Sequence, residues 1–304
     1  MHVRVPASTA NLGPGFDALG LALDLHEEVT LRRQPHGAPP AIAVHGVNAK
    51  RLHADENLLA YQAARALFRH IGRTLPSLAL DLHTRIPRSG GLGGSAAAIV
   101  GGAFAANVLE GSPLGSAELL SLVAEVEGHP DNVSAALLGG LVITVQGRTG
   151  LIAKRLDPPR DLRAIVCIPR QSISTRAARG VLPTHLSVPD AVFNLSRTAL
   201  LIAAFETSDW ALLRDAMDDR LHQPARGGIF APLFPTIEAA IGAGAHGAAL
   251  SGSGAAMIAF ATESFKEIAT AMTAAAEAHG APSRADVLRL SARGATVMAT
   301  EPQA

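Results

Sequence analysis

Four glycines between Pro87 and Ala97 form the part of the sequence whose composition points most directly to chemistry. This segment, Pro-Arg-Ser-Gly-Gly-Leu-Gly-Gly-Ser-Ala-Ala, lies between an alternating, strand-like stretch (Leu78–Ile86) and an alanine-rich, helix-like stretch (Gly94–Leu109). Glycine allows a positive φ and a close approach to a ligand, and the free amides and dipole of a helix start attract negative charge. The segment therefore predicts a phosphate-binding loop; a strand-to-helix turn without a ligand is the alternative interpretation.

Two widespread phosphate-binding motifs fit this loop badly. A Walker loop needs a lysine before its Ser or Thr, but Gly94 precedes Ser95, and none of the three lysines of the chain lies in the loop. A dinucleotide fingerprint places its glycines directly after a strand and its acidic residue after the next strand, whereas Pro87–Ser89 intervene and Glu110 ends a helix-like stretch. The loop must therefore hold phosphate through backbone amides and Ser95.

The overall composition favours a protein that acts on a small molecule. The 304 residues include 26 basic and 26 acidic side chains, so the charge gives no reason to expect a nucleic acid or an anionic membrane as partner. No uninterrupted apolar run reaches the roughly 18 to 20 residues of a membrane span, and Met1–Pro6 alternates like a strand rather than a signal peptide. We expect a soluble, cytoplasmic protein without a nucleic-acid or membrane partner, in which Cys167, within an apolar run, is buried.

The elements that must position the loop follow a mixed α+β pattern. Strands are expected at His2–Val5, Leu21–Arg32, Ala41–Val44, Leu78–Ile86, Gly140–Gln146, Ala164–Pro169, Ala248–Ser251 and Met257–Phe260. Helices are expected at Asn57–Ile71, Gly94–Leu109, Ser116–Glu127, Asp190–Phe205, Pro235–Gly242 and Glu263–His279. Gly, Arg and Pro interrupt the apolar pattern over Gln146–Arg163, which predicts two lobes, residues 1–150 and 151–304.

Three motifs in register make the chain similar to a known family. They are Pro6–Gly20 (Pro-Ala-Ser-Thr-Ala-Asn-Leu-Gly-Pro-Gly-Phe-Asp-Ala-Leu-Gly), the loop at Pro87–Ala97, and Gly247–Gly254 (Gly-Ala-Ala-Leu-Ser-Gly-Ser-Gly). Together they resemble the GHMP kinases, the superfamily of galactokinase, homoserine kinase, mevalonate kinase and phosphomevalonate kinase. The first motif and Glu127–Val133 (Glu-Gly-His-Pro-Asp-Asn-Val) resemble the homoserine kinase branch in particular.

The resemblance, which Ser174–Pro183 and Asp219–Arg226 extend, implies both a fold and an activity. The fold is a two-lobed α+β GHMP kinase fold, with an N-terminal lobe like ribosomal protein S5 and a ferredoxin-like C-terminal α/β lobe. The activity is ATP- and Mg²⁺-dependent phosphorylation of the hydroxyl of L-homoserine in threonine biosynthesis, and a homodimer is common in the family. The alternatives are another GHMP-type kinase, acting on mevalonate or shikimate, and a non-catalytic protein that binds ATP or an amino acid.

Two positions depart from the family pattern. Gly94 replaces the first serine of the usual Gly-Leu-Gly-Ser-Ser loop, and Ala255 stands where the third motif commonly has proline. The first change removes a hydroxyl and with it one hydrogen bond to phosphate, while Ser95 keeps the other.

Six residues are expected to bind the amino-acid substrate by resemblance to the family: Asn11, Asp17, His129, Asn132, Arg179 and Arg226. A guanidinium group suits a carboxylate because it binds in a two-pronged fork, and an aspartate suits an ammonium group. The asparagines and the histidine can orient the hydroxyl and amino groups. Asn11 and Asp17 lie in a segment rich in Pro and Gly, where they could equally stabilise a turn.

The nucleotide and its metal ion are assigned by the same resemblance. The expected ATP-binding residues are Asn57, Pro87, Arg88, Ser89, Gly90, Gly91, Leu92, Gly93, Gly94, Ser95, Ala96, Ala97, Ser251, Gly252 and Ser253. Mg²⁺ prefers oxygen ligands and keeps several waters, so Ser95 and Glu127 suffice beside the phosphates, with Glu125 as a rival for the carboxylate. Asn57 could instead cap the helix that it begins.

Asn132 and Asp131 are the expected catalytic residues. Asp131 lies near the place where mevalonate-type relatives carry a catalytic aspartate, whereas homoserine kinases are described as orienting the hydroxyl with asparagine. A carboxylate with an ordinary pKa of about 4 is a poor base for an alcohol, and a loose phosphoryl-transfer transition state needs mainly positioning and charge neutralisation. The favoured interpretation is direct in-line transfer with Asn132 holding the hydroxyl and Asp131 supporting the loop; the existence of a general base is left open.

Overall fold

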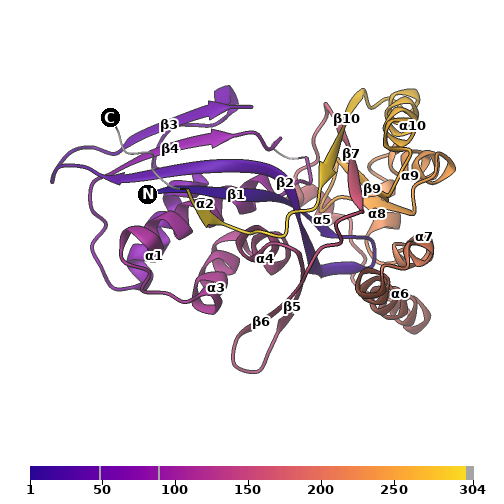
Figure 1. The fold of residues 1–304 in the computed structure, drawn as a ribbon, viewed down its shortest axis with the longest axis horizontal. Helices are drawn as coiled ribbons and strands as arrows, with labels where there is room; N and C mark the ends of the chain where they lie inside the picture. Colours follow the sequence, from indigo (N-terminus) through magenta and orange to yellow (C-terminus); the bar gives the residue numbers. More distant parts are fainter. Residues whose placement is uncertain (48, 88–89, 299–304) are drawn as a thin grey trace.

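The computed structural model describes residues 1–47, 49–87 and 90–298, which form two lobes, each built on its own β-sheet (Figure 1). The first sheet has the strand order β11-β1-β2-β4-β3, and β5 pairs with β2 and β6. Its strands are β1 (His2–Asn11), β2 (Gly15–Arg33), β3 (Ala41–Gly46), β4 (Leu78–Thr84), β5 (Leu141–Gln146), β6 (Leu151–Leu156) and β11 (Thr296–Val297). Its helices, which lie together on one side of the sheet in Figure 1, are α1 (Leu59–His70), α2 (Gly94–Leu109), α3 (Ser116–Glu127) and α4 (Pro130–Leu138).

The second sheet is antiparallel, with the order β10-β7-β9-β8. Its strands are β7 (Arg163–Pro169), β8 (Gly247–Leu250), β9 (Met257–Ala261) and β10 (Ser283–Arg289). Its helices are α5 (Thr175–Gly180), α6 (Val188–Thr207), α7 (Leu213–Ala216), α8 (Gln223–Gly227), α9 (Leu233–Gly242) and α10 (Phe265–Ala278). Cys167 is fully buried in β7, as the sequence predicted, and burial raises the pKa of its thiol to about 11.

Helix α2, which follows the glycine-rich loop, is packed between the first sheet and α1. It is apolar on every side, as expected of a helix surrounded by protein. Two glycines bring its neighbours close: a Cβ on Gly101 would lie 2.6 Å from Cγ2 of Val29, and a Cβ on Gly102 would lie 1.8 Å from the carbonyl oxygen of Ala60. The start of α2 is therefore held in place against both the sheet and α1.

The pattern of the sequence predicted most of these elements. Helices α2 and α3 begin and end where they were expected, and β4 buries Leu78, Leu80 and Leu82 while exposing His83. The sequence predicted that regular structure is interrupted over Gln146–Arg163. This prediction is wrong in part, because strand β6 lies within that segment. A six-residue strand between Gly- and Pro-containing turns gives too short an alternation to be recognised. Helix α4 and the C-terminal strands β10 and β11 were also missed.

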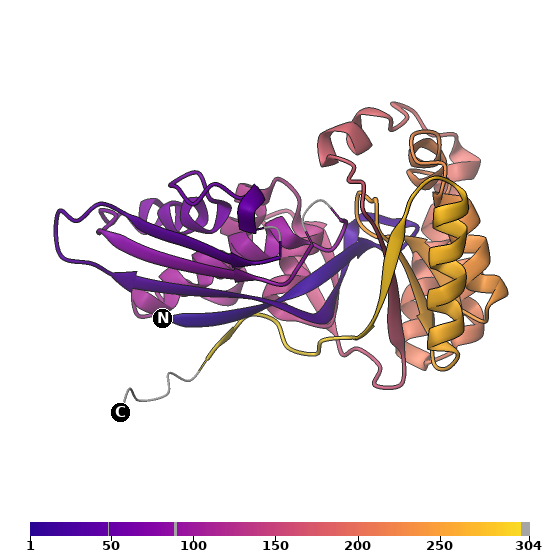
Figure 2. The same ribbon diagram turned by 90° about the horizontal axis from the view of Figure 1, so that it is seen from above.

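The division of the chain at residue 150 stays a proposal. β5 and β6 lie on either side of it and pair with each other in the first sheet. The end of the described chain returns to that sheet as well: Figure 2 shows the segment after β10 running back toward it, where β11 pairs with β1.

Helix α6 has the length and composition of a membrane-crossing helix, with 20 residues and a mean hydropathy of 1.2. Buried positions make up 22% of its most apolar window. The sequence showed no uninterrupted apolar run because Asp190 and Arg197 break this one. Asn194 links α6 to the segment between α7 and α8, since its side-chain amide donates a hydrogen bond of 2.7 Å to Asp219.

Candidate active site

A cavity of about 330 Å³ is lined by residues of both lobes and collects most of the positions that the sequence singled out. This volume is within the range of small-molecule sites. The predicted residues that line it are Asn11, Asp17, Asn57, Gly90, Gly91, Leu92, Gly93, Gly94, Ser95, Glu127, His129, Asp131, Asn132, Arg179, Arg226, Gly252 and Ser253. Pro87, Ala96, Ala97 and Ser251 are buried beside it, and Arg88 and Ser89 lie outside the described residues.

The glycine-rich loop turns into α2 through two left-handed glycines. Gly91 has a φ of 71° and Gly93 a φ of 65°, and α2 begins at the next residue, Gly94. Such values are readily adopted only by glycine. The turn leaves the first residues of a sixteen-residue helix, Gly94 and Ser95, at the cavity wall. The helix start is where the sequence predicted it, and free amides and the helix dipole at such a place favour an anion. Phosphate binding there stays a prediction.

The third motif packs against this loop and is held by its own polar groups. Ser251 donates a hydrogen bond of 2.6 Å to the carbonyl oxygen of Gly91, and its hydroxyl lies 2.8 Å from that of Thr9. Gly252 donates its backbone N–H to Ala10. The side chain of Ser251 therefore joins the first motif to the loop, while Gly252 and Ser253 reach the cavity.

The side chain of Asn11 forms hydrogen bonds with the backbone. Its Nδ2 donates to the carbonyl oxygen of Gly252 at 2.9 Å, and its Oδ1 accepts from the backbone N–H of Asp17 at 3.1 Å. Both residues have a positive φ, 71° for Asn11 and 54° for Asp17, which is uncommon outside glycine. These contacts match the turn-stabilising alternative, and a direct contact of Asn11 with substrate stays a prediction.

Asn57 is among the residues that line the cavity. Helix α1 begins after Leu58, and no side chain caps it, so Asn57 does not have the capping role that was its alternative. The apolar residues Leu52, Leu82 and Ile86 line the same cavity. Apolar side chains together with an amide group suit a flat heterocycle such as adenine.

Ser95 and Glu127 meet at the start of α2. The Ser95 hydroxyl donates a hydrogen bond of 2.6 Å to Glu127 Oε1, whereas Glu125 is exposed and does not line the cavity. Burial raises the pKa of Glu127 above its ordinary value and the charge of Asp131 adds to the increase, while Ser95 and His129 oppose it. The geometry thus brings Glu127, and not its rival, to the oxygen of Ser95.

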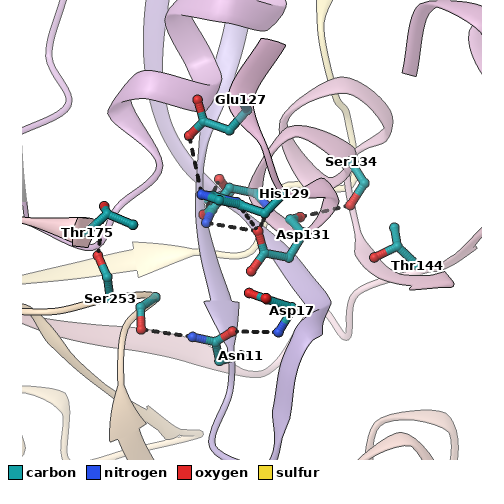
Figure 3. A network of polar contacts seen from close by, with 12 residues as sticks. Asn11, Asp17, Glu127, His129, Asp131, Ser134, Thr144, Thr175 and Ser253 are labelled. Atoms are coloured by element: carbon teal, nitrogen blue, oxygen red, sulfur yellow. Dashed lines mark hydrogen bonds and ion pairs between the residues drawn. The ribbon is translucent and has the colours of Figure 1, made fainter. Parts of the chain in front are cut away.

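His129 and Asp131 lie next to Glu127 (Figure 3), and Asn132, the following residue in the chain, lines the same cavity. Asp131 Oδ1 accepts hydrogen bonds from the backbone N–H of Asn132 at 2.7 Å and lies 2.8 Å from Nδ1 of His129. Burial disfavours the charged form of His129, but the Asp131 hydrogen bond and the charges of Asp131 and Glu127 outweigh it and raise the pKa of His129. Asp131 therefore contacts both neighbours, and its role as a supporting or a catalytic residue stays a prediction.

Two arginines and an aspartate occupy the wall formed by the first motif and the second lobe. Arg179 forms a two-pronged ion pair with Asp17, with distances of 3.0 and 2.7 Å. Arg226 is 2% exposed, and the guanidinium carbons of both arginines lie about 5.5 Å from the ring centre of Phe16. The predicted substrate residues Asp17, Arg179 and Arg226 are thus brought together around one aromatic ring.

Several residues at the site were missed by the sequence analysis. Ser8 is fully buried and donates a hydrogen bond of 3.0 Å to Asn132 Oδ1, and Thr175 approaches Ser253. Glu27, buried in β2, and His53 line the cavity as well. Ser8 lies in the motif Pro6–Gly20 and Thr175 in the segment Ser174–Pro183. Their positions in these motifs could have identified them as residues of the site.

Comparison with known proteins gives the same picture. Residues 58–140 match the model of the GHMP kinase N-terminal domain, and residues 201–278 match that of the GHMP kinase C-terminal domain. A homoserine kinase of Moorella thermoacetica is 45% identical over 273 residues, which cover 90% of this chain and 91% of the relative. A homoserine kinase of Desulfitobacterium hafniense is 39% identical over 299 residues, which cover 98% of this chain and 100% of the relative. The crystal structure of homoserine kinase from Cytophaga hutchinsonii superposes with a TM-score of 0.88 at 30% identity, covering 98% of this chain and 97% of that one.

The two matched domains, with a glycine-rich helix start facing charged residues across one cavity, define a small-molecule kinase of the GHMP class. Its two-lobed α+β fold is the one that the sequence predicted. Within that class, the chain belongs to the homoserine kinase family.

The close contact between loop and third motif can be tested with two substitutions in the loop. In Gly91→Ala, the new Cβ would lie 2.1 Å from the carbonyl oxygen of Ser251, at a positive φ. Steady-state kinetics should show a loss of kcat/KM for ATP of about 100-fold, because the loop must move away. In Gly94→Ala the nearest atoms are at 3.5 and 3.6 Å, so a much smaller loss is expected; equal losses would contradict the steric argument.

Proposed function

We propose that this chain transfers the γ-phosphoryl group of ATP to the side-chain hydroxyl of L-homoserine and forms O-phospho-L-homoserine, a step of threonine biosynthesis. One observation carries the proposal: a glycine-rich helix start and three charged residues, Asp17, Arg179 and Arg226, line the same cavity. The helix start suits phosphate, and the charged residues suit the carboxylate and ammonium groups of a free amino acid.

ATP would bind with its phosphates at the glycine-rich loop and its base near Asn57. Gly90 to Ser95 offer backbone amides and the Ser95 hydroxyl to the phosphates, and no lysine of the chain lies in this loop. Asn57 and the leucines beside it are assigned to adenine. Phosphate binding would thus depend on the backbone and the dipole of α2 rather than on the lysine of a Walker loop.

Ser95 and Glu127 fit a magnesium ion. They offer a hydroxyl and a carboxylate oxygen 2.6 Å apart at the edge of the phosphate loop, which are the hard ligands that Mg²⁺ prefers. Among the described residues no cluster of three or more His, Cys, Asp or Glu side chains is arranged to hold a metal, so the remaining ligands would be phosphate and water. When bound, the ion supplies charge neutralisation on the phosphoryl oxygens.

The amino-acid substrate would exchange partners with the ion pair of Asp17 and Arg179. A zwitterion presents a carboxylate to Arg179 and an ammonium group to Asp17, so each member of the pair keeps an opposite charge after the exchange. Arg226 adds a second guanidinium for the carboxylate, and His129 can orient the amino group. The ion pair between Asp17 and Arg179 would thus be replaced by two ion pairs with the substrate. An uncharged alcohol offers no such replacement, so a free amino acid suits this wall better.

Asn132 would hold the hydroxyl that is phosphorylated. Ser8 donates to Oδ1 of Asn132, and Nδ2 of Asn132 donates one N–H to Asp131 Oδ1 at 3.4 Å. The second N–H of Nδ2 would donate to the oxygen of the hydroxyl. A donor at this place fixes the direction of an oxygen lone pair toward the γ-phosphate, which is what an in-line displacement needs. Asp131 accepts from His129 and Asn132, and its role is to keep both in position.

We further propose that the protein works in the cytoplasm, without a nucleic-acid or membrane partner, as a homodimer. The balance of 26 basic and 26 acidic residues supports the absence of a polyanionic partner. Homodimers are common in the family to which the chain belongs.

The proposed activity predicts ADP release from ATP and Mg²⁺ in the presence of L-homoserine, and only background release with mevalonate, shikimate or galactose. A coupled assay of ADP across the four acceptors measures it, with O-phospho-L-homoserine identified by mass spectrometry. Release with mevalonate or shikimate alone would make the chain another GHMP kinase, and binding of ATP and homoserine without turnover would make it a binding protein.

The proposed metal ligands predict a change in the Mg²⁺ requirement. Ser95→Ala and Glu127→Gln should each raise the Mg²⁺ concentration for half-maximal rate at least about tenfold, because each removes an oxygen ligand. Glu125→Gln is the matched control, since Glu125 is exposed and lies outside the cavity. A Mg²⁺ titration at saturating ATP checks this, and an equal effect of the control would contradict the assignment.

A further inference from the structure

His222, immediately before α8, lies in the interior behind the substrate wall and contacts Arg226. Its side chain is fully buried, and both ring nitrogens have a defined partner. Nε2 lies 2.7 Å from the carbonyl oxygen of Gly13, and Nδ1 lies 3.0 Å from Nη1 of Arg226. Nothing in the catalytic scheme above uses this residue.

The partners of His222 determine its tautomer. A carbonyl oxygen can only accept a hydrogen bond and a guanidinium can only donate one, so Nε2 carries the proton and Nδ1 accepts. His222 is therefore neutral. Burial lowers the pKa of His222 to about 4, and the charge of Arg226 adds to the decrease, while Asp219 and the hydrogen bond to Gly13 oppose it.

Arg226 is oriented through acceptors that are all uncharged. Nη1 donates to His222 and to the carbonyl oxygen of Gly252, and Nε donates to that of Ala178 at 3.3 Å. Within the described residues, no hydrogen bond uses Nη2. Burial and the charge of Arg179 lower the pKa of Arg226 to about 10, so it remains a cation at neutral pH. Its orientation is fixed while its charge stays free for an anion in the cavity.

His222 is itself held rigidly. Asp219, 4% exposed, accepts hydrogen bonds from the backbone N–H groups of Leu221, His222 and Gln223 and from the side chain of Asn194. These bonds fix the turn that starts α8. The ring of Phe16 lies 5.3 Å from the ring of His222, so the imidazole cannot swing away on that side.

We propose that His222 is a positioning residue that holds Arg226 in the orientation that binds the carboxylate of the amino-acid substrate. The inference rests on the proposed function, since it gives a task to a group behind the same wall. A carboxylate in place of the imidazole would also fix the guanidinium but would neutralise it. A neutral acceptor orients Arg226 and leaves its charge to the substrate.

Two substitutions separate the two hydrogen bonds of the ring. Asparagine places its Oδ1 near the position of Nδ1, so His222→Asn keeps the acceptor for Arg226. Glutamine places its amide nitrogen near Nε2, so His222→Gln keeps the donor to Gly13 and loses that acceptor. His222→Gln should raise the KM for homoserine about tenfold or more, with a smaller change in kcat and an unaltered KM for ATP. His222→Asn should restore most of the loss.

A double-mutant cycle tests whether His222 acts through Arg226. In an Arg226→Ala background, His222→Gln should add little to the increase in the KM for homoserine, since the group that it positions is absent. Additive effects would overturn the proposal. Equal losses in both His222 variants, extending to the KM for ATP, would show a purely structural role and overturn it as well.

The wild-type protein offers a check that does not depend on the variants folding. Nitrogen NMR of the His222 ring at neutral pH should show an unprotonated Nδ1 and a protonated Nε2, and a protonated Nδ1 would overturn the inference. A wild-type protein that is inactive with L-homoserine would reject the proposed function and this inference with it. An active wild type whose His222→Gln variant keeps the normal KM for homoserine would reject the inference alone.

Discussion

The backbone of Gly252 is the point on which the geometry of the cavity depends. Its carbonyl oxygen accepts hydrogen bonds of 2.9 Å from Asn11 and from Arg226, and its N–H donates to Ala10. The backbone N–H and carbonyl of one residue thus join the first motif, the third motif and helix α8, which are far apart in the chain. The backbone of Gly252 carries no net charge. It therefore holds the three elements together without forming an ion pair with a charged group in the cavity.

The two arginines of the substrate wall are stabilised in different ways. Arg179 has a direct carboxylate partner, because it forms a two-pronged ion pair with Asp17. Arg226 is surrounded by uncharged acceptors, and its burial makes its charge costly. In the proposed function, the substrate carboxylate would add a direct ion pair to Arg226, while Arg179 would exchange Asp17 for the substrate. One arginine would then favour binding of an anion and the other would select for a zwitterion.

The sequence predicted the parts of the site that depend on local backbone chemistry. The turn at Gly91 and Gly93 and the start of α2 follow from residue types that few other conformations tolerate. Other contacts join residues that are far apart in the chain. Ser8 and Asn132 are separated by 124 positions, and Gly13 and His222 are separated by 209 positions. Such pairings depend on how the sheets and helices pack, and a buried serine or histidine has no local pattern that reveals its partner.

The return of the chain to its first strand has a consequence for synthesis. Val3 pairs with Val297 and Arg4 with Thr296, so β1 receives its second neighbour from β11. On the ribosome β1 emerges before the second lobe and β11 after it, so this edge of the sheet lacks β11 while the second lobe is being made. The first lobe therefore completes its sheet only after the second has emerged, which makes the two lobes a single unit of assembly.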